Sequence, residues 1–165
     1  MKQYALVIDH KACWGCMTCE VACKQENGSP DGIKLISVLE DGPKLVNGKL
    51  DFVFQVNVCL HCDDYPCGDA CPDEAIFRRE DGIVIMDYEA CTGCEQCIPA
   101  CPYDAITFDM DRLIARKCNL CYHRVDQGLI PACADNVCLA HCNYFGEPGE
   151  IRQRIEALRN EVLGN

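Results

Sequence analysis

Residues 91–102 read Cys91-Thr92-Gly93-Cys94-Glu95-Gln96-Cys97-Ile98-Pro99-Ala100-Cys101-Pro102, a run with the spacing C-x2-C-x2-C-x3-C-P. The same cysteine spacing without the proline begins at Cys13, and a near copy, C-x2-C-x4-C-x3-C-P, begins at Cys59. Because one spacing recurs along the chain, the cysteines are expected to act in groups. The four groups are Cys13, Cys16, Cys19 and Cys23; Cys59, Cys62, Cys67 and Cys71; Cys91, Cys94, Cys97 and Cys101; and Cys118, Cys121, Cys133 and Cys138, with Cys142 close behind.

The composition shows why these groups matter for folding. Cysteine makes up 17 of the 165 residues, and the hydrophobic fraction of 49% includes it. Without cysteine the hydrophobic fraction is about 39%, which is low for a chain of this length to build a generous aliphatic core. Disulfides or bound metal must therefore support the fold. The odd cysteine count means that the thiols cannot all sit in intramolecular pairs.

Several classes of protein are excluded or disfavoured. A net charge of −11 argues against nucleic-acid binding, which needs a basic surface. No run of 18 apolar residues is present, so no membrane span is expected. The first residues, Met1 to His10, lack the pattern of a secretory signal. We therefore expect a cytoplasmic location, where dense cysteines bind metal more often than they form disulfides.

The spacing favours iron–sulfur clusters over zinc. A cubane needs four thiolates at the corners of a tetrahedron, and three cysteines in one loop can wrap three corners. The fourth cysteine of the C-x2-C-x2-C-x3-C-P run ligates the neighbouring cluster, so such motifs work in pairs. Structural zinc typically uses two C-x2-C knuckles separated by a longer stretch. The sequence therefore predicts [4Fe–4S] clusters.

An internal repeat predicts the fold class. Residues 70–76, Ala-Cys-Pro-Asp-Glu-Ala-Ile, match residues 100–106, Ala-Cys-Pro-Tyr-Asp-Ala-Ile. A hairpin is expected after each copy, over 75–86 and over 105–115. We also predict a strand over 4–8, short helices over 20–26 and 119–127, and loops over 27–31 and 40–49. The expected class is α+β, with two fused bacterial-ferredoxin-like modules: an inner one of residues 52–117 and an outer one of residues 1–51 and 118–147.

Residues 148–165 are predicted to form an amphipathic C-terminal helix. Ile151, Ile155, Leu158 and Val162 recur at helical spacing on one face. This face is expected to pack on its own domain. The alternative is a docking helix for a partner or for a second copy of the chain.

Three runs of the sequence resemble motifs of a known family. Residues 13–27, the run Lys117-Cys118-Asn119-Leu120-Cys121-Tyr122-His123-Arg124 and the run Pro131-Ala132-Cys133 are similar to motifs of the iron–sulfur subunits of the dimethyl-sulfoxide-reductase type. The resemblance covers about residues 4–147. Small polyferredoxin subunits of tungsten aldehyde oxidoreductases and of tungsten-dependent benzoyl-CoA reductases are similar in kind. The family resemblance implies a subunit with four [4Fe–4S] clusters that relays electrons for a molybdenum- or tungsten-pterin enzyme.

The resemblance also implies how the cysteines pair. Cluster 1 would take Cys13, Cys16, Cys19 and Cys138; cluster 2 would take Cys118, Cys121, Cys133 and Cys23; cluster 3 would take Cys59, Cys62, Cys67 and Cys101; and cluster 4 would take Cys91, Cys94, Cys97 and Cys71. One cysteine is left over. Members of the family usually end the fourth motif as C-x3-C-P, whereas here Cys133 to Cys138 is C-x4-C and Leu139 replaces the proline. The run Tyr144-Phe145-Gly146 favours Cys138 as the last ligand, with Cys142 as the alternative.

The expected function is electron transfer without catalysis. Four thiolates close each cluster to substrate, and neither G-x-G-x-x-G nor G-x4-G-K-[ST] is present for a nucleotide. The expected partners are the molybdenum- or tungsten-pterin catalytic subunit and a flavin- or quinone-linked redox subunit. The alternative is a self-associating chain that forms an electron-conducting or scaffolding oligomer.

Some charged and titratable residues lie near the cysteines in sequence. His61 and His123 are expected to be hydrogen-bonded or surface histidines rather than ligands. Arg112, Arg116, Lys117 and Arg124 form a local basic group, and Asp109 to Asp111 form an acidic run. We expect a solvated basic face and an exposed acidic turn. The alternative for the basic group is a charge partner of a cluster. The alternative for the acidic run is a docking patch.

Overall fold

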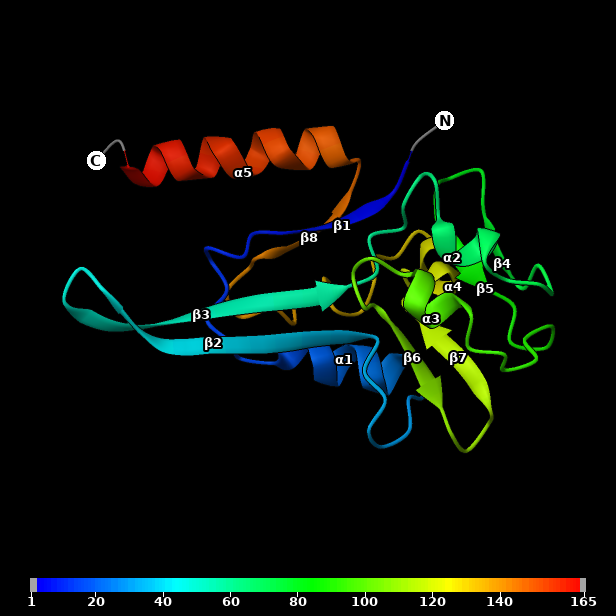
Figure 1. Ribbon diagram of the computed structural model, residues 1–165. Coiled ribbons are helices and arrows are strands. Elements are labelled where there is room, and N and C mark those ends of the chain that lie inside the picture. The colour runs from blue at the N-terminus through cyan, green and yellow to red at the C-terminus, as the bar shows by residue number, and fades with distance from the viewer. Residues whose placement is uncertain (1–2, 164–165) are drawn as a thin grey trace.

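The computed structural model describes residues 3–163, and side-chain surroundings through residue 160. Short helices and two-stranded antiparallel sheets follow one another along the chain (Figure 1). The strands pair as β1–β8, β2–β3, β4–β5 and β6–β7. The elements are β1 (Ala5–Ile8), α1 (Thr18–Glu26), β2 (Ile36–Val46), β3 (Lys49–Val58), α2 (Pro66–Asp69), β4 (Ile76–Arg78), β5 (Val84–Met86), α3 (Cys97–Ala100), β6 (Ile106–Asp109), β7 (Ile114–Lys117), α4 (Tyr122–Val125), β8 (Asn143–Gly146) and α5 (Pro148–Leu163).

The internal repeat forms the predicted structure. Each copy places a four-residue helix before a hairpin: α2 precedes β4–β5, and α3 precedes β6–β7. Ile76 pairs with Met86 in the first hairpin, and Ile106 pairs with Lys117 in the second. The predicted α+β class, with small hairpins and a C-terminal helix, is therefore confirmed.

The first strand pairs with the last one. Leu6 of β1 lies opposite Phe145 of β8, and the rings of Tyr4 and Phe145 stack with their centroids 5.1 Å apart. Segments from both ends of the chain therefore lie side by side (Figure 1). The division into an inner and an outer module stays a prediction, and its boundary between residues 51 and 52 falls inside β3.

The loop predicted over 40–49 is wrong. This segment belongs to the long β2–β3 hairpin, which extends to one side of the molecule in Figure 1. Its turn is Asn47-Gly48, with φ of 51° and 78° at these two residues. Asn-Gly is the preferred sequence for such a two-residue turn, so the sequence does carry a signal for it. The flanking strands are hard to recognise because most of their side chains are exposed, and no buried face produces a regular alternation.

Buried side chains form two apolar clusters, and cysteines belong to both. The first cluster includes Leu6, Ile36 and Val58 together with cysteines of the first and fourth motifs. The second includes Ile76, Val84 and Ile106 together with cysteines of the second and third motifs. Thiols therefore occupy interior positions that an ordinary small domain fills with aliphatic side chains.

The C-terminal helix packs on its own domain, as expected. Ile151 and Ile155 of α5 are buried, whereas Leu158 on the same predicted face remains 42% exposed. The helix contacts β1 and β8, and Arg159 forms an ion pair with Asp9. The side chain of Val162 lies outside the described residues. Within residues 3–163, no helix combines the length and the apolar composition needed to cross a bilayer.

This packing predicts the effect of removing one buried side chain from α5. Substitution Ile155→Ala deletes buried apolar groups at the contact with β1 and β8, which costs about 2 kcal/mol. Amide hydrogen exchange in α5 is therefore expected to accelerate roughly 30-fold, because the local opening becomes easier by that free energy. The control is Leu158→Ala, which removes a half-exposed side chain. Equal acceleration in the two variants would contradict the packing described.

Candidate metal centres

All 17 cysteines lie in the described part of the chain and are free thiols. The loops that carry the first and third motifs share an unusual backbone. Gly15 and Gly93 have φ of 73° and 72°, and the residues two positions later, Met17 and Glu95, also have positive φ. Such conformations turn successive backbone N–H groups towards the inside of a loop, where they can face an anionic group.

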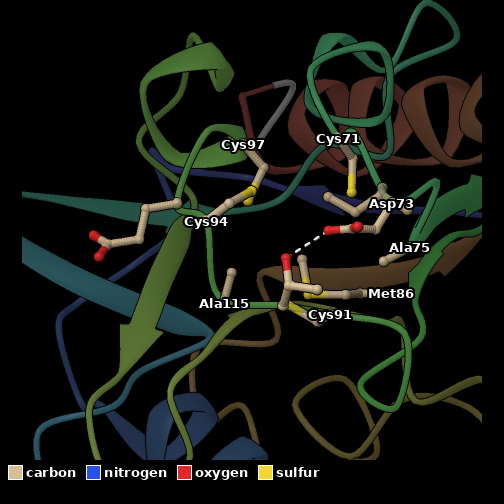
Figure 2. Close-up of a pocket in the computed structure, with 11 residues that line it drawn as sticks. Cys71, Asp73, Ala75, Met86, Cys91, Cys94, Cys97 and Ala115 are labelled. Carbon is tan, nitrogen blue, oxygen red and sulfur yellow. Dashed lines mark hydrogen bonds between the residues drawn. The ribbon is translucent and has the colours of Figure 1, made fainter.

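The cysteines gather around four places, named here sites A to D. Site D is formed by Cys71, Cys91, Cys94 and Cys97, which line one pocket together with Met86 and Ala115 (Figure 2). Cys71 comes from the second motif and the other three cysteines come from the third. The hydroxyl of Thr92 donates a hydrogen bond to the Asp73 carboxylate at the edge of the pocket (2.5 Å).

Site C shows the reciprocal arrangement. Cys59, Cys62 and Cys67 of the second motif line a pocket with Cys101 of the third motif. The remaining walls include Leu60, His61, Tyr65, Val84 and Ile106. The second and third motifs therefore exchange one cysteine each, because each fourth cysteine lies on or beside a short helix that leads away from its own loop.

Site B combines Cys23 of the first motif with Cys118, Cys121 and Cys133 of the fourth. Burial raises the pKa of the Cys133 thiol well above its usual range, and the nearby thiols of the other three cysteines raise it further. The Asn27 side-chain amide lies 3.5 Å from the Cys23 sulfur and 3.8 Å from the Cys121 sulfur. Asn27 thus links the two motifs at this site.

Site A holds five cysteines. Cys19 has Cys16 and Cys138 as neighbours, and Cys142 has Cys138 and Cys13 as neighbours. The sulfurs of Cys138 and Cys142 lie 3.4 Å apart, and the backbone N–H of Cys142 also lies 3.4 Å from the Cys138 sulfur. Both candidates for the last ligand are therefore buried at the same site.

The donor set suits polynuclear clusters better than single ions. Among the described residues, no three side chains of the metal-binding types converge on one point. Zinc requires four ligand atoms about 2.0–2.3 Å from a single ion. A cubane gives each thiolate its own iron, so its ligands surround a volume, as the thiols of sites C and D do. The residues present therefore fit [4Fe–4S] clusters.

The four sites form a continuous series. Burial raises the pKa of Cys97 in site D to about 11, and Cys67 of site C is among the neighbouring thiols that contribute. Burial raises the pKa of Cys118 in site B, and Cys59 of site C contributes there. Cys19 of site A contributes in the same way to the pKa of Cys133 in site B. Neighbouring thiols thus link site D to site C, site C to site B, and site B to site A.

Three charged residues near this series are buried, so the expected solvated face and exposed turn are wrong for them. Lys117 and Asp109 are each 1% exposed, and Arg116 is 4% exposed. The Lys117 ammonium donates to the carbonyl of Cys118 (2.8 Å) and to that of Val84. Arg116 pairs with Asp109 (3.3 Å) and donates to the carbonyl of Asn27 (3.0 Å). Lys117 thus lies near the thiols of Cys67 and Cys118, and Arg116 lies near the thiol of Cys23.

The two histidines beside cysteines have different surroundings. His61 is buried, and its Nδ1 accepts a hydrogen bond from the backbone N–H of Val84 (2.9 Å). Burial and the nearby Lys117 charge lower the pKa of His61 well below its usual value. His123 is exposed, and its Nε2 lies 2.8 Å from the Glu26 carboxylate.

The sequence interpretation missed two amides that contact this region. Asn27 directly follows α1, where an asparagine is ordinarily a helix cap, and its backbone N–H indeed bonds to the Cys23 carbonyl (3.0 Å). Asn143 directly follows Cys142, and its side chain donates to the Cys133 carbonyl (3.1 Å). The available signal was their place within or beside the cysteine motifs.

Comparisons with known proteins give a consistent picture. Residues 50–148 match the family of 4Fe-4S dicluster domains. The chain is 37% identical over 164 residues to the B subunit of tetrathionate reductase from Salmonella typhimurium, covering 96% of this chain and 64% of that protein. It is 38% identical over 176 residues to a putative iron-sulfur B subunit of dimethyl sulfoxide reductase from Halobacterium salinarum (89% and 67%). It is 37% identical over 166 residues to the B polypeptide of polysulfide reductase from Wolinella succinogenes (99% and 84%). The chain thus spans about two thirds of the length of the first two relatives.

Backbone geometry at site D predicts a specific sensitivity. A Cβ atom added at Gly93 would lie 2.2 Å from the Leu113 carbonyl oxygen, so Gly93→Ala must displace the loop that carries Cys91 and Cys94. We expect this variant to bind about four irons fewer per chain, one cubane. The control is Gly128→Ala, which has a similar positive φ but nothing within 4 Å of the added atom. Iron and protein assays on anaerobically purified protein test this, and an unchanged iron content in Gly93→Ala would refute it.

Proposed function

This protein belongs to the family of 4Fe-4S dicluster proteins, and we propose that it is a non-catalytic electron-transfer subunit carrying four [4Fe–4S] clusters. The resemblance to iron–sulfur subunits of the dimethyl-sulfoxide-reductase type is confirmed by the relatives it matches. The observation that supports the proposal is the gathering of the cysteines at four places, two of which are pockets lined by four thiols each. A domain with two clusters accounts for two of these sites, and the other two would hold two further clusters.

The proposed ligand sets follow the four sites. Site A would use Cys13, Cys16, Cys19 and Cys138; site B would use Cys118, Cys121, Cys133 and Cys23; site C would use Cys59, Cys62, Cys67 and Cys101; and site D would use Cys91, Cys94, Cys97 and Cys71. Each site draws its fourth thiol from the other motif of its pair. Because paired motifs exchange one thiol each, their two sites lie next to each other. This supports the pairing of the first motif with the fourth and of the second motif with the third.

Bound clusters would supply one-electron carriers whose potentials depend on charge, hydrogen bonds to sulfur and exposure to water. The protein holds the thiols in fixed positions and keeps water away from most of them, since many of the cysteines are buried. The buried Lys117 adds a positive charge beside sites B and C, which favours the reduced state of a cluster held there. With four thiolates per cluster, no iron would be open to a substrate.

A catalytic subunit is the proposed partner. The relatives are named as B components of reductases that act on tetrathionate, dimethyl sulfoxide and polysulfide. We infer that this chain passes single electrons between a molybdenum- or tungsten-pterin catalytic subunit and a second, flavin- or quinone-linked redox partner, in the cytoplasm. The self-assembling oligomer considered from the sequence is not favoured, because these relatives are named as parts of reductases.

The metal content tests the proposal directly. Anaerobically purified protein is expected to be brown, to contain about sixteen irons per chain and to undergo reversible one-electron reductions. Iron and zinc assays and redox titration provide the measurements. Stoichiometric zinc with almost no iron would refute the proposed function. A stable content of about eight irons would mean that the protein carries two clusters and not the proposed four.

The last ligand at site A can be identified by two substitutions. Cys138 lies within hydrogen-bond range of both the thiol and the backbone N–H of Cys142, which is the environment of a ligand thiolate. Cys138→Ser is therefore expected to disturb the cluster of site A, seen as lost iron or an altered electron paramagnetic resonance signal. The matched variant Cys142→Ser should keep the full iron content. The reverse pattern would assign Cys142 as the ligand.

A further inference from the structure

Of the two ring nitrogens of His61, Nδ1 has a hydrogen-bond partner and Nε2 has none among the described residues. The ring is 6% exposed and forms part of the wall of site C. Its Nδ1 accepts the hydrogen bond from Val84 N–H. Its Nε2 is buried and has no hydrogen-bond partner among the described residues. Buried polar groups in native proteins are nearly always paired, and an unpaired donor costs about 1–3 kcal/mol.

The bond to Val84 fixes the proton on the ring. A nitrogen that accepts from a backbone N–H carries no proton, so the ring proton must sit on Nε2. Nε2 is thus a buried donor that needs an acceptor. The neighbouring walls of site C are the aliphatic residues Leu60, Val84 and Ile106, the tyrosines Tyr65 and Tyr103, two prolines and the four thiols. Neither tyrosine hydroxyl forms a hydrogen bond with Nε2, which has no partner among the described residues, so the sulfur of a bound cluster is the acceptor that this site would supply.

We propose that His61 donates a hydrogen bond from Nε2 to a sulfur of the cluster at site C and thereby raises the reduction potential of that cluster. This inference rests on the proposed function, because it requires a cluster at the site. Reduction adds negative charge to the cluster, so a hydrogen bond to sulfur is stronger in the reduced state and favours it. His61 is a positioning residue and not a ligand, since the four cysteines complete the site.

Val84 connects His61 to the buried charge. Its N–H binds His61, and its carbonyl accepts from the Lys117 ammonium, which also binds the carbonyl of Cys118 in site B. Both groups shift the redox equilibrium of a cluster towards its reduced state, because a hydrogen-bond donor and a positive charge each stabilise a reduced cluster. Site C lies inside the series, between sites D and B, so its potential influences electron passage through the whole chain.

Two substitutions separate the donor from the rest of the ring. In His61→Asn, the side-chain oxygen replaces Nδ1 and can accept from Val84, while the donor at the Nε2 position is lost. In His61→Gln, the amide nitrogen reaches the Nε2 position and keeps a donor there. The matched control is His123→Gln, which alters a histidine that also follows a cysteine motif but is exposed and bound to Glu26.

Redox titration of the iron-loaded protein, followed by electron paramagnetic resonance, provides the main measurement. In His61→Asn, one cluster is expected to shift to a lower potential by about tenfold in its reduced-to-oxidised ratio, about 59 mV for one electron. His61→Gln should stay within about twofold of the wild type, and His123→Gln should not shift. Iron content should remain unchanged in all three variants. Unchanged potentials in His61→Asn, or equal shifts in the Asn and Gln variants, would overturn the inference.

A second measurement needs no variant at this position. Wild-type protein prepared with ¹⁴N- or ¹⁵N-histidine should show, by pulsed electron paramagnetic resonance, one ring nitrogen weakly coupled to a reduced cluster. Absence of this coupling would refute the donor role. Wild-type protein without iron would refute the proposed function itself. Full iron content without a coupled nitrogen would refute this inference alone.

Discussion

Buried sulfur is the constraint on which the rest of this structure depends. Helices of four residues and isolated two-stranded hairpins are not stable alone in water. Here such elements surround spaces lined by thiols, and cysteines belong to both apolar clusters. The surrounding aliphatic residues, such as Ile76 and Val84, hold the thiols in place but form no large core of their own. Folding and cluster binding are therefore coupled, as in other small proteins whose ligands assemble only in the folded state.

Much of the fold could be predicted from local patterns. The repeated Ala-Cys-Pro run and the turn residues after it indicated both short hairpins, and the spacing of Ile151 and Ile155 indicated the buried face of α5. The β2–β3 hairpin was missed because an exposed strand pair leaves little hydrophobic alternation. The burial of Lys117 and Asp109 could not be predicted either. Charges near one another in sequence ordinarily face water, and burial is decided by partners far along the chain, such as Val84.

The candidate sites divide in the same way. The grouping of cysteines within a motif is a local property, so spacing predicts it. The transfer of the fourth cysteine to a neighbouring site was also expected from the spacing. Which motifs pair depends on the three-dimensional path of the chain, and that was expected through a family resemblance. The choice between Cys138 and Cys142 is hard from sequence because both reach the same site, 3.4 Å apart. The orphaned nitrogen of His61 is visible only when the bond between Nδ1 and Val84 is known.

The pairing of β1 with β8 has a consequence for biosynthesis. The thiols of sites C and D end at Cys101, and the apolar walls of these sites are complete once β6 and β7 have supplied Ile106 and Ala115. Sites A and B must wait for residues beyond Cys118, and the strand made first waits for the strand that precedes α5. The thiols of the first motif therefore have no completed site until nearly the whole chain has been made. A cluster at that end would therefore form late in synthesis, after the cysteines of the fourth motif have been added.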